Sequence, residues 1–196
     1  PKTFGINIAV SPGVSDIDQQ ERETLEAVTF FIDAGVIPSW FTLNLSCPNT
    51  EDDPLGHQLE AETRQLCIGF INHLQSHGLD VPLWVKISPN LDRSQYQMLI
   101  QIFNEVGVKA IIATNTLGQP TPDDPTIQAG VGGGVLFKES LLAVTYLRSE
   151  KIQKNYSIDI IGCGGVLDGT TYQDYRTLDV QAVQYWSAMI YRGPLA

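Results

Sequence analysis

Short apolar runs alternate with longer stretches of helical composition along the whole chain. Six of these runs have the apolar, β-rich composition of strands, and most are followed by polar or glycine-rich residues. We predict strands at residues 4–10, 41–45, 81–89, 110–113, 158–161 and 182–186.

Helices are predicted in the intervals between these strands, at residues 16–34, 59–77, 94–106, 139–151 and 171–178. Gly35, Gly78 and Gly107 follow three of them directly and are typical of helix ends. Strands that alternate with helices at this spacing predict a parallel sheet with right-handed crossovers. The strands are uninterrupted apolar runs, as expected for a sheet that is covered on both faces.

Either a doubly wound sheet or a (β/α) barrel satisfies this pattern. The GxGxxG motif that opens the usual dinucleotide-binding fold is missing, whereas glycine-rich residues and a serine follow the last two strands, where barrels often bind phosphate. We therefore predict an α/β fold of the (β/α)8 TIM-barrel type, as a single partial domain over residues 1–196 with about six of the eight strand–helix units. The Gly/Pro-rich stretch 118–134 is predicted to be a functional loop.

Composition narrows the range of partners. The chain of 196 residues is 43% hydrophobic and 17% charged, so it can bury a core. A net charge of −10 argues against nucleic acid or an anionic membrane surface as partner. Three cysteines without a CxxC spacing indicate neither a disulfide framework nor a zinc site, and no apolar run is long enough for a membrane span.

Polar residues and glycines gather where the predicted strands end, and these ends share one rim of a parallel barrel. Amide side chains there can hold a polar heterocycle, a lysine can neutralise developing charge, and adjacent glycines let backbone N–H groups approach a phosphate. Taken singly, the amides can be strand terminators, the lysine can extend to water and the glycines can form a turn. The residues at this rim are Asn7, Asn44, Cys47, Asn49, Lys86, Asn115, Thr116, Gly164, Gly165 and Ser187.

Seven spaced segments give the chain a resemblance to a known family. They are residues 5–7, 44–50, 85–87, 113–116, 132–133, 160–165 and 191–194. In this order they resemble the dihydroorotate dehydrogenases, FMN-dependent barrels of pyrimidine synthesis. The resemblance covers nearly the whole chain, from Phe4 to Pro194.

The resemblance implies a role for each matching residue. Cys47 would be the base that removes the C5 proton of dihydroorotate, while hydride passes from C6 to N5 of FMN. The pyrimidine would contact Asn44, Asn49, Asn115 and Thr116. FMN would contact Asn7, Asn44, Lys86, Thr114, Gly133, Gly164, Gly165, Trp186 and Ser187.

Features of two family classes are mixed in this sequence. Cys47 is similar to the base of the soluble class, whereas segments 84–87, 113–116 and 184–187 resemble the quinone-linked class. The electron acceptor is therefore left open among quinone, fumarate and NAD. The location is expected to be cytoplasmic, or peripheral to a membrane through a segment not present here.

Other positions depart from the family pattern. Residues 51–54, Asp179-Val180 and Trp186 differ from its usual residues, and only six strands are visible, corresponding to the family's third to eighth. We expect the chain to be a fragment, or to be completed by a partner chain such as a second copy. Two alternatives to the enzyme remain: a related dihydropyrimidine-type flavin dehydrogenase, and a non-catalytic incomplete barrel.

Overall fold

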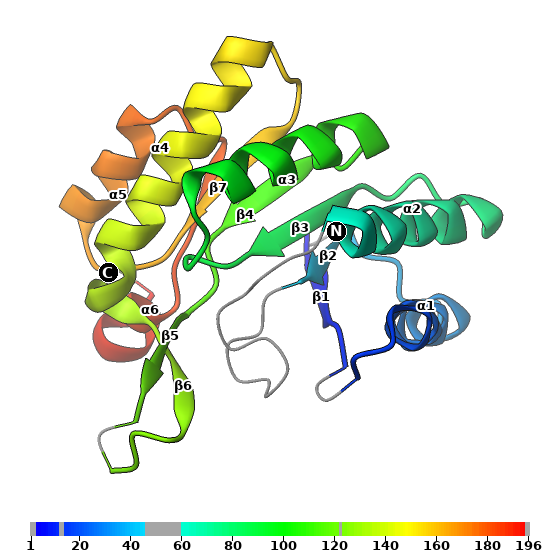
Figure 1. The fold of residues 1–196 in the computed structure, drawn as a ribbon, viewed down its shortest axis with the longest axis horizontal. Helices are drawn as coiled ribbons and strands as arrows, with labels where there is room; N and C mark the ends of the chain where they lie inside the picture. Colours follow the sequence, from blue (N-terminus) through cyan, green and yellow to red (C-terminus); the bar gives the residue numbers. More distant parts are fainter. Residues whose placement is uncertain (1–2, 12–13, 46–59, 122, 195–196) are drawn as a thin grey trace.

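The computed structural model describes residues 3–11, 14–45, 60–121 and 123–194. Its main feature is a six-stranded parallel sheet with the order β1-β2-β3-β4-β7-β8 (Figure 1). The strands are β1 (Gly5–Ala9), β2 (Trp40–Asn44), β3 (Leu83–Ile87), β4 (Ala110–Ala113), β7 (Asp159–Cys163) and β8 (Ala182–Gln184). The predicted parallel sheet of six strands is confirmed.

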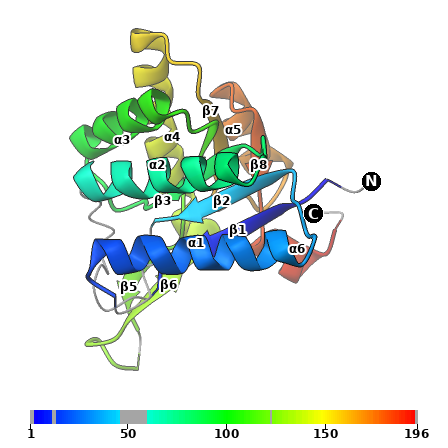
Figure 2. The same ribbon diagram turned by 90° about the vertical axis from the view of Figure 1, so that its right-hand side faces the viewer.

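Helices connect the strands and cover one face of the sheet (Figures 1 and 2). They pack in sequence order, α1 on α2, α2 on α3, α3 on α4 and α4 on α5, so that the curved sheet and its outer layer form a half-barrel. Their bounds are α1 (Ile17–Asp33), α2 (Glu60–Ser76), α3 (Arg93–Val106), α4 (Phe137–Lys154) and α5 (Gly169–Thr177).

Side chains that alternate along the strands build two separate apolar clusters. The larger cluster lies between the sheet and the helices, where Phe41, Val85 and Phe103 are fully buried. The smaller cluster lies on the opposite, concave face and contains Ile112 and Ile161. Both faces of the central strand β4 are therefore covered, which is why its four residues are all apolar and buried.

Two tryptophans stack beside the smaller cluster. The rings of Trp40 and Trp84 lie 4.3 Å apart at an angle of 14°. Gly5, the neighbour of Trp40 across the β1–β2 pairing, leaves the space that the Trp40 indole occupies, because a Cβ at this position would overlap the ring.

Local sequence sets the ends of several helices. Asp16 caps α1 by accepting a hydrogen bond of 2.7 Å from the Gln19 N–H. Asp92 and Gln95 form a reciprocal capping box at the start of α3. Gly107 ends the same helix in the left-handed conformation, with φ of 93°, where a residue with a side chain would be strained.

Two segments differ from the sequence-based prediction. Residues 118–134, predicted as a loop, contain an antiparallel hairpin of β5 (Leu117–Pro120) and β6 (Gln128–Val131), which projects away from the sheet (Figure 1). The hairpin leads into a short 3-10 helix, η1 (Gly133–Leu136). The last predicted strand ends at Gln184, and the short helix α6 (Ser187–Arg192) follows it.

Candidate functional site

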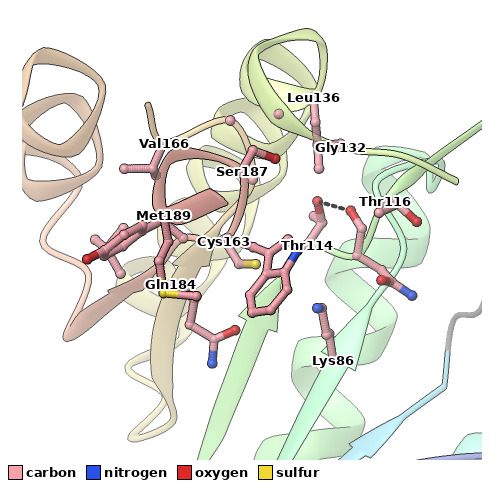
Figure 3. A pocket seen from close by; sticks show the side chains of 17 residues that line it. Lys86, Thr114, Thr116, Gly132, Leu136, Cys163, Val166, Gln184, Ser187 and Met189 are labelled. Carbon is pink, nitrogen blue, oxygen red and sulfur yellow. Dashed lines mark hydrogen bonds between the residues drawn. The ribbon is translucent and has the colours of Figure 1, made fainter. Parts of the chain in front are cut away.

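A cavity of about 720 Å³ lies at the carboxyl ends of β3, β4, β7 and β8 (Figure 3). This volume falls in the range of small-molecule and cofactor sites. Nine residues that the sequence predicts for the flavin or the pyrimidine line it: Lys86, Thr114, Asn115, Thr116, Gly133, Gly164, Gly165, Trp186 and Ser187.

Lys86 places a positive charge in this cavity. It lies in β3, opposite Ile112 of β4, and Figure 3 shows its side chain among those that line the cavity. Cys163, at the end of β7, is near enough for the Lys86 charge to affect its thiol. Burial raises the pKa of Cys163, and the lysine opposes that rise. Lys86 can therefore stabilise negative charge on a bound ring.

Amide and hydroxyl groups form the wall around the end of β4. The Thr114 and Ser140 hydroxyls lie 2.6 Å apart, and both side chains are buried. The Asn115 amide donates to the Asn44 side-chain oxygen at 3.4 Å, which links the ends of β4 and β2. These groups can donate and accept hydrogen bonds toward a planar, polar ligand.

Glycine backbone forms the opposite wall. Gly133, Gly164 and Gly165 have φ of 78°, 129° and 69°, a region that residues with side chains rarely adopt. A Cβ at Gly133 would lie 3.3 Å from the Ser187 hydroxyl oxygen, so this glycine lets the backbone lie close to Ser187. Backbone N–H groups held this way, together with a hydroxyl, can bind a phosphate group.

The mouth of the cavity has an apolar side chain that is largely open to solvent. Trp186 lies between β8 and α6, directly before the first residue of α6, and is 68% exposed. Met189, one turn along α6, lines the same cavity. A large ring at this position can cover the apolar part of a bound ligand.

Four of the predicted site residues are not among the cavity's lining residues. Asn7 is an exposed residue of β1, the outer strand of the sheet. Asn44 is buried and contacts the site through Asn115. Cys47 and Asn49 lie outside the described residues. The roles predicted for these four residues stay predictions.

Several residues that line the cavity were not predicted from the sequence. Cys163 was not predicted as a site residue, because the strand was predicted to end at residue 161. It is the last residue of β7, and alternation along the strand places it on the concave face with Ile161. Gln184 also lines the cavity, from the end of β8. The strand was predicted to continue to residue 186, so Gln184 was not recognised as a polar residue at a strand end. Leu136, at the end of η1, and Val166, in the loop after β7, also line the cavity, and no sequence pattern indicated them.

Six parallel strands, an outer layer of helices and a cavity at the carboxyl ends of the strands define the (β/α)-barrel class, here as a half-barrel. A family model described as dihydroorotate dehydrogenase matches residues 4–196. The chain belongs to the dihydroorotate dehydrogenase family, as the sequence motifs predicted.

Individual relatives agree with this assignment. The chain is 31% identical over 208 residues to the dihydroorotate dehydrogenase (quinone) of Leptothrix cholodnii, covering 97% of this chain and 55% of that protein. It is 34% identical over 173 residues to the enzyme of the same name from Bordetella pertussis, covering 82% and 48%. The chain thus spans about half the length of the curated relatives it matches.

Solved structures support the fold. A ligand-free DHODH from Eimeria tenella superposes with a TM-score of 0.78 at 23% identity, covering 98% of this chain and 56% of that one. The complex of the DHODH from Eimeria tenella with ferulenol gives a TM-score of 0.77 at 22% identity, covering 97% and 54%. The partial (β/α) barrel predicted from the sequence is therefore confirmed.

Proposed function

We propose that this protein binds FMN in the cavity at the strand ends and oxidises dihydroorotate to orotate, a step of pyrimidine synthesis. The main observation is that nine residues predicted for the flavin or the pyrimidine, from separate segments of the chain, line one cavity. Membership of the dihydroorotate dehydrogenase family supports the same function.

The chemistry of the cavity wall suits a flavin phosphate at one end and a flavin ring at the other. The backbone of the glycines at 133, 164 and 165 lines the cavity together with the Ser187 hydroxyl, so both backbone N–H groups and a hydroxyl can serve as donors. Lys86 and Thr114 face the remaining space and suit the polar edge of the ring. FMN, when bound, would accept the hydride that leaves C6 of dihydroorotate.

The residues proposed to bind the substrate line the same cavity as those proposed to bind the flavin ring. Asn115 and Thr116 would hydrogen-bond the pyrimidine, together with Asn44, which is already linked to Asn115. Cys47 would take the C5 proton, because a thiolate can act as a base near neutral pH. Loss of that proton and of the C6 hydride balances the conversion of dihydroorotate to orotate.

A quinone is the electron acceptor that the relatives favour, since their names specify quinone. None of the helices in the described part of the chain is long and apolar enough to span a membrane. We therefore propose that a quinone reoxidises the flavin.

Titration of the purified protein with FMN tests the cofactor assignment. For the chain extended N-terminally by two strand–helix units, we expect saturable quenching of FMN fluorescence and a yellow protein after gel filtration. Gly133→Val places a branched side chain against Ser187 and should weaken binding strongly, whereas Gly78→Val, at a glycine after α2 with an equally positive φ, controls for backbone strain. A colourless protein that cannot be reconstituted would support the non-catalytic incomplete barrel instead.

A further inference from the structure

A buried tyrosine hydroxyl lies behind the glycine turn of the cavity. Tyr175, in α5, donates a hydrogen bond of 2.8 Å to the carbonyl oxygen of Gly164. Its side chain is fully buried, and it is not one of the residues that line the cavity. The hydroxyl therefore contacts the backbone of the turn from behind the cavity.

The ring of Tyr175 is held on the helix side of β7. A Cβ on Gly162 would overlap this ring, and Gly162 faces the helices because the alternate residues Ile161 and Cys163 face the concave side. Phe137 of α4 packs on the ring edge to face, with centroids 5.9 Å apart. Packing on both sides fixes the direction from which the hydroxyl reaches Gly164.

This direction determines where the next N–H group points. In a trans peptide the carbonyl and the N–H point to opposite sides. Because the Gly164 carbonyl points toward Tyr175, the Gly165 N–H points toward the cavity that both glycines line. Within the described residues, the Gly165 N–H donates no hydrogen bond to another residue. With no acceptor among the described residues, this N–H group is available to a ligand on the cavity side.

Ser140 connects this turn to the opposite wall. Its hydroxyl lies 2.6 Å from that of Thr114, and a Cβ at Gly164 would overlap its side chain. Burial raises the pKa of Tyr175, and a hydrogen bond from Ser140 opposes that rise. Buried hydroxyls of α4 and α5 thus join the cavity segments that follow β4 and β7.

We propose that Tyr175 is a positioning residue, supported by Ser140, that holds the Gly165 N–H toward the cavity so that it binds a phosphate monoester. This inference rests on the proposed flavin site and identifies the groups that preorganise its phosphate end. A preorganised donor binds an anion better because no peptide has to rotate when the ligand arrives.

Phosphate-bearing and phosphate-free flavins separate this role from simple packing. Tyr175→Phe removes the hydroxyl and keeps the ring against Gly162 and Phe137. We expect the FMN dissociation constant to rise about 2- to 10-fold, the usual effect of one lost hydrogen bond, and that of riboflavin to stay unchanged. Tyr172→Phe, an exposed tyrosine of the same helix, is the matched control and should change neither.

A second readout does not require tight binding. In the ¹⁵N-labelled protein, FMN or inorganic phosphate should shift the Gly165 amide resonance, and riboflavin should shift it much less. Tyr175→Phe should reduce the phosphate-dependent part of this shift. Ser140→Ala should reduce it in the same direction if the Ser140 hydroxyl supports Tyr175.

Each contradictory result has a distinct meaning. Equal weakening of FMN and riboflavin by Tyr175→Phe, or no effect on FMN, would show that the tyrosine only packs, while the flavin site itself stands. A parent protein that binds FMN and riboflavin equally, without a phosphate-dependent shift at Gly165, would also overturn the positioning role. A parent protein that binds neither FMN nor inorganic phosphate would contradict both this inference and the proposed function.

Discussion

Lys86 illustrates how one side chain can define the electrostatics of this cavity. The chain as a whole is acidic, with a net charge of −10, yet the concave face places an ammonium group at the cavity. Because the surrounding strands are apolar, the charge is screened less there than it would be in water. Stabilisation of a reduced, anionic flavin ring is the effect we expect from it.

Lys86→Ala should therefore lower the reduction potential of bound FMN and weaken FMN binding. The loss of attraction acts more on the reduced, negatively charged ring than on the oxidised ring. Equilibration with a redox dye measures the potential, and Lys109→Ala, an exposed lysine at the opposite end of β4, is the control. An unchanged potential in Lys86→Ala would mean that the amine does not act on the ring.

His73 gives the fold a pH dependence that is separate from the site. Its ring nitrogen lies 2.8 Å from the Thr29 hydroxyl, between α2 and α1. Burial lowers the pKa of His73, and the neighbouring His77 lowers it further. The unfolded chain therefore binds a proton at a pH where the folded protein does not.

This shift sets the sign of the effect on stability. The contribution of neutral His73 to the free energy of unfolding is fully present above the pKa of about 6.5 that His73 has in the unfolded chain. This contribution is lost as the pH falls through the lower pKa that His73 has in the folded protein. His73→Gln cannot be protonated, so we expect it to lose less stability than the parent between pH 7.5 and 5.5. Urea unfolding at the two pH values measures this, and equal losses in both proteins would contradict it.

At the scale of elements, the strands and helices predicted most accurately from the sequence are those in which composition and end signals agree. Residues 110–113 were predicted as a strand and form β4 with these bounds. The helix predicted at residues 94–106 is α3 (Arg93–Val106), and its end was predicted correctly because Gly107, directly after Val106, is a clear signal for the end of a helix. Both elements belong to the repeated strand–helix pattern, which explains why the fold class could be derived.

Other elements could not be derived because their residues carry no clear local pattern. The Gly/Pro-rich residues of the β5–β6 hairpin resemble a loop, although the two strands pair antiparallel with Leu117 opposite Val131. Likewise α6 has six residues, too few for a helical period to be read. The Tyr175 contact joins a helix to Gly164 across a turn, and no local pattern predicts that pairing.

The α3 capping box offers a direct test of one local signal. Asp92 accepts a hydrogen bond of 2.9 Å from the Gln95 N–H, and the Gln95 side chain accepts one from the Asp92 N–H. Asp92→Ala should lower the free energy of unfolding by about 1 kcal/mol and Tm by roughly 2–4 °C. Asp92→Asn keeps a capping oxygen and should cost much less; equal losses in both variants would show that the cap is not the cause.

At the scale of the whole molecule, the half-barrel leaves two outer strands. In the described sheet, β1 pairs only with β2 and β8 only with β7. Open strand edges favour pairing with other chains. The relatives are about twice as long as this chain, so their additional residues are available to complete such a sheet.

We expect the 196-residue chain, produced alone, to self-associate or precipitate and to hold FMN weakly. An N-terminal extension by two strand–helix units should give a monodisperse, yellow protein. Gel filtration with light scattering and an absorbance spectrum compares the two. A monodisperse monomer of the short chain with stoichiometric FMN would show that the fold needs no further strands.

The central proposal is that dihydroorotate transfers hydride to FMN at this cavity, with Cys47 as the base. The most direct measurement is the flavin absorbance of the FMN-loaded protein after anaerobic addition of dihydroorotate, in a form of the chain that retains FMN. We expect rapid bleaching in the parent, and bleaching about 10²- to 10⁴-fold slower in Cys47→Ala with FMN still bound. A parent protein that holds FMN but is not bleached would contradict the proposed reaction, and bleaching of Cys47→Ala at the parental rate would contradict the role of Cys47.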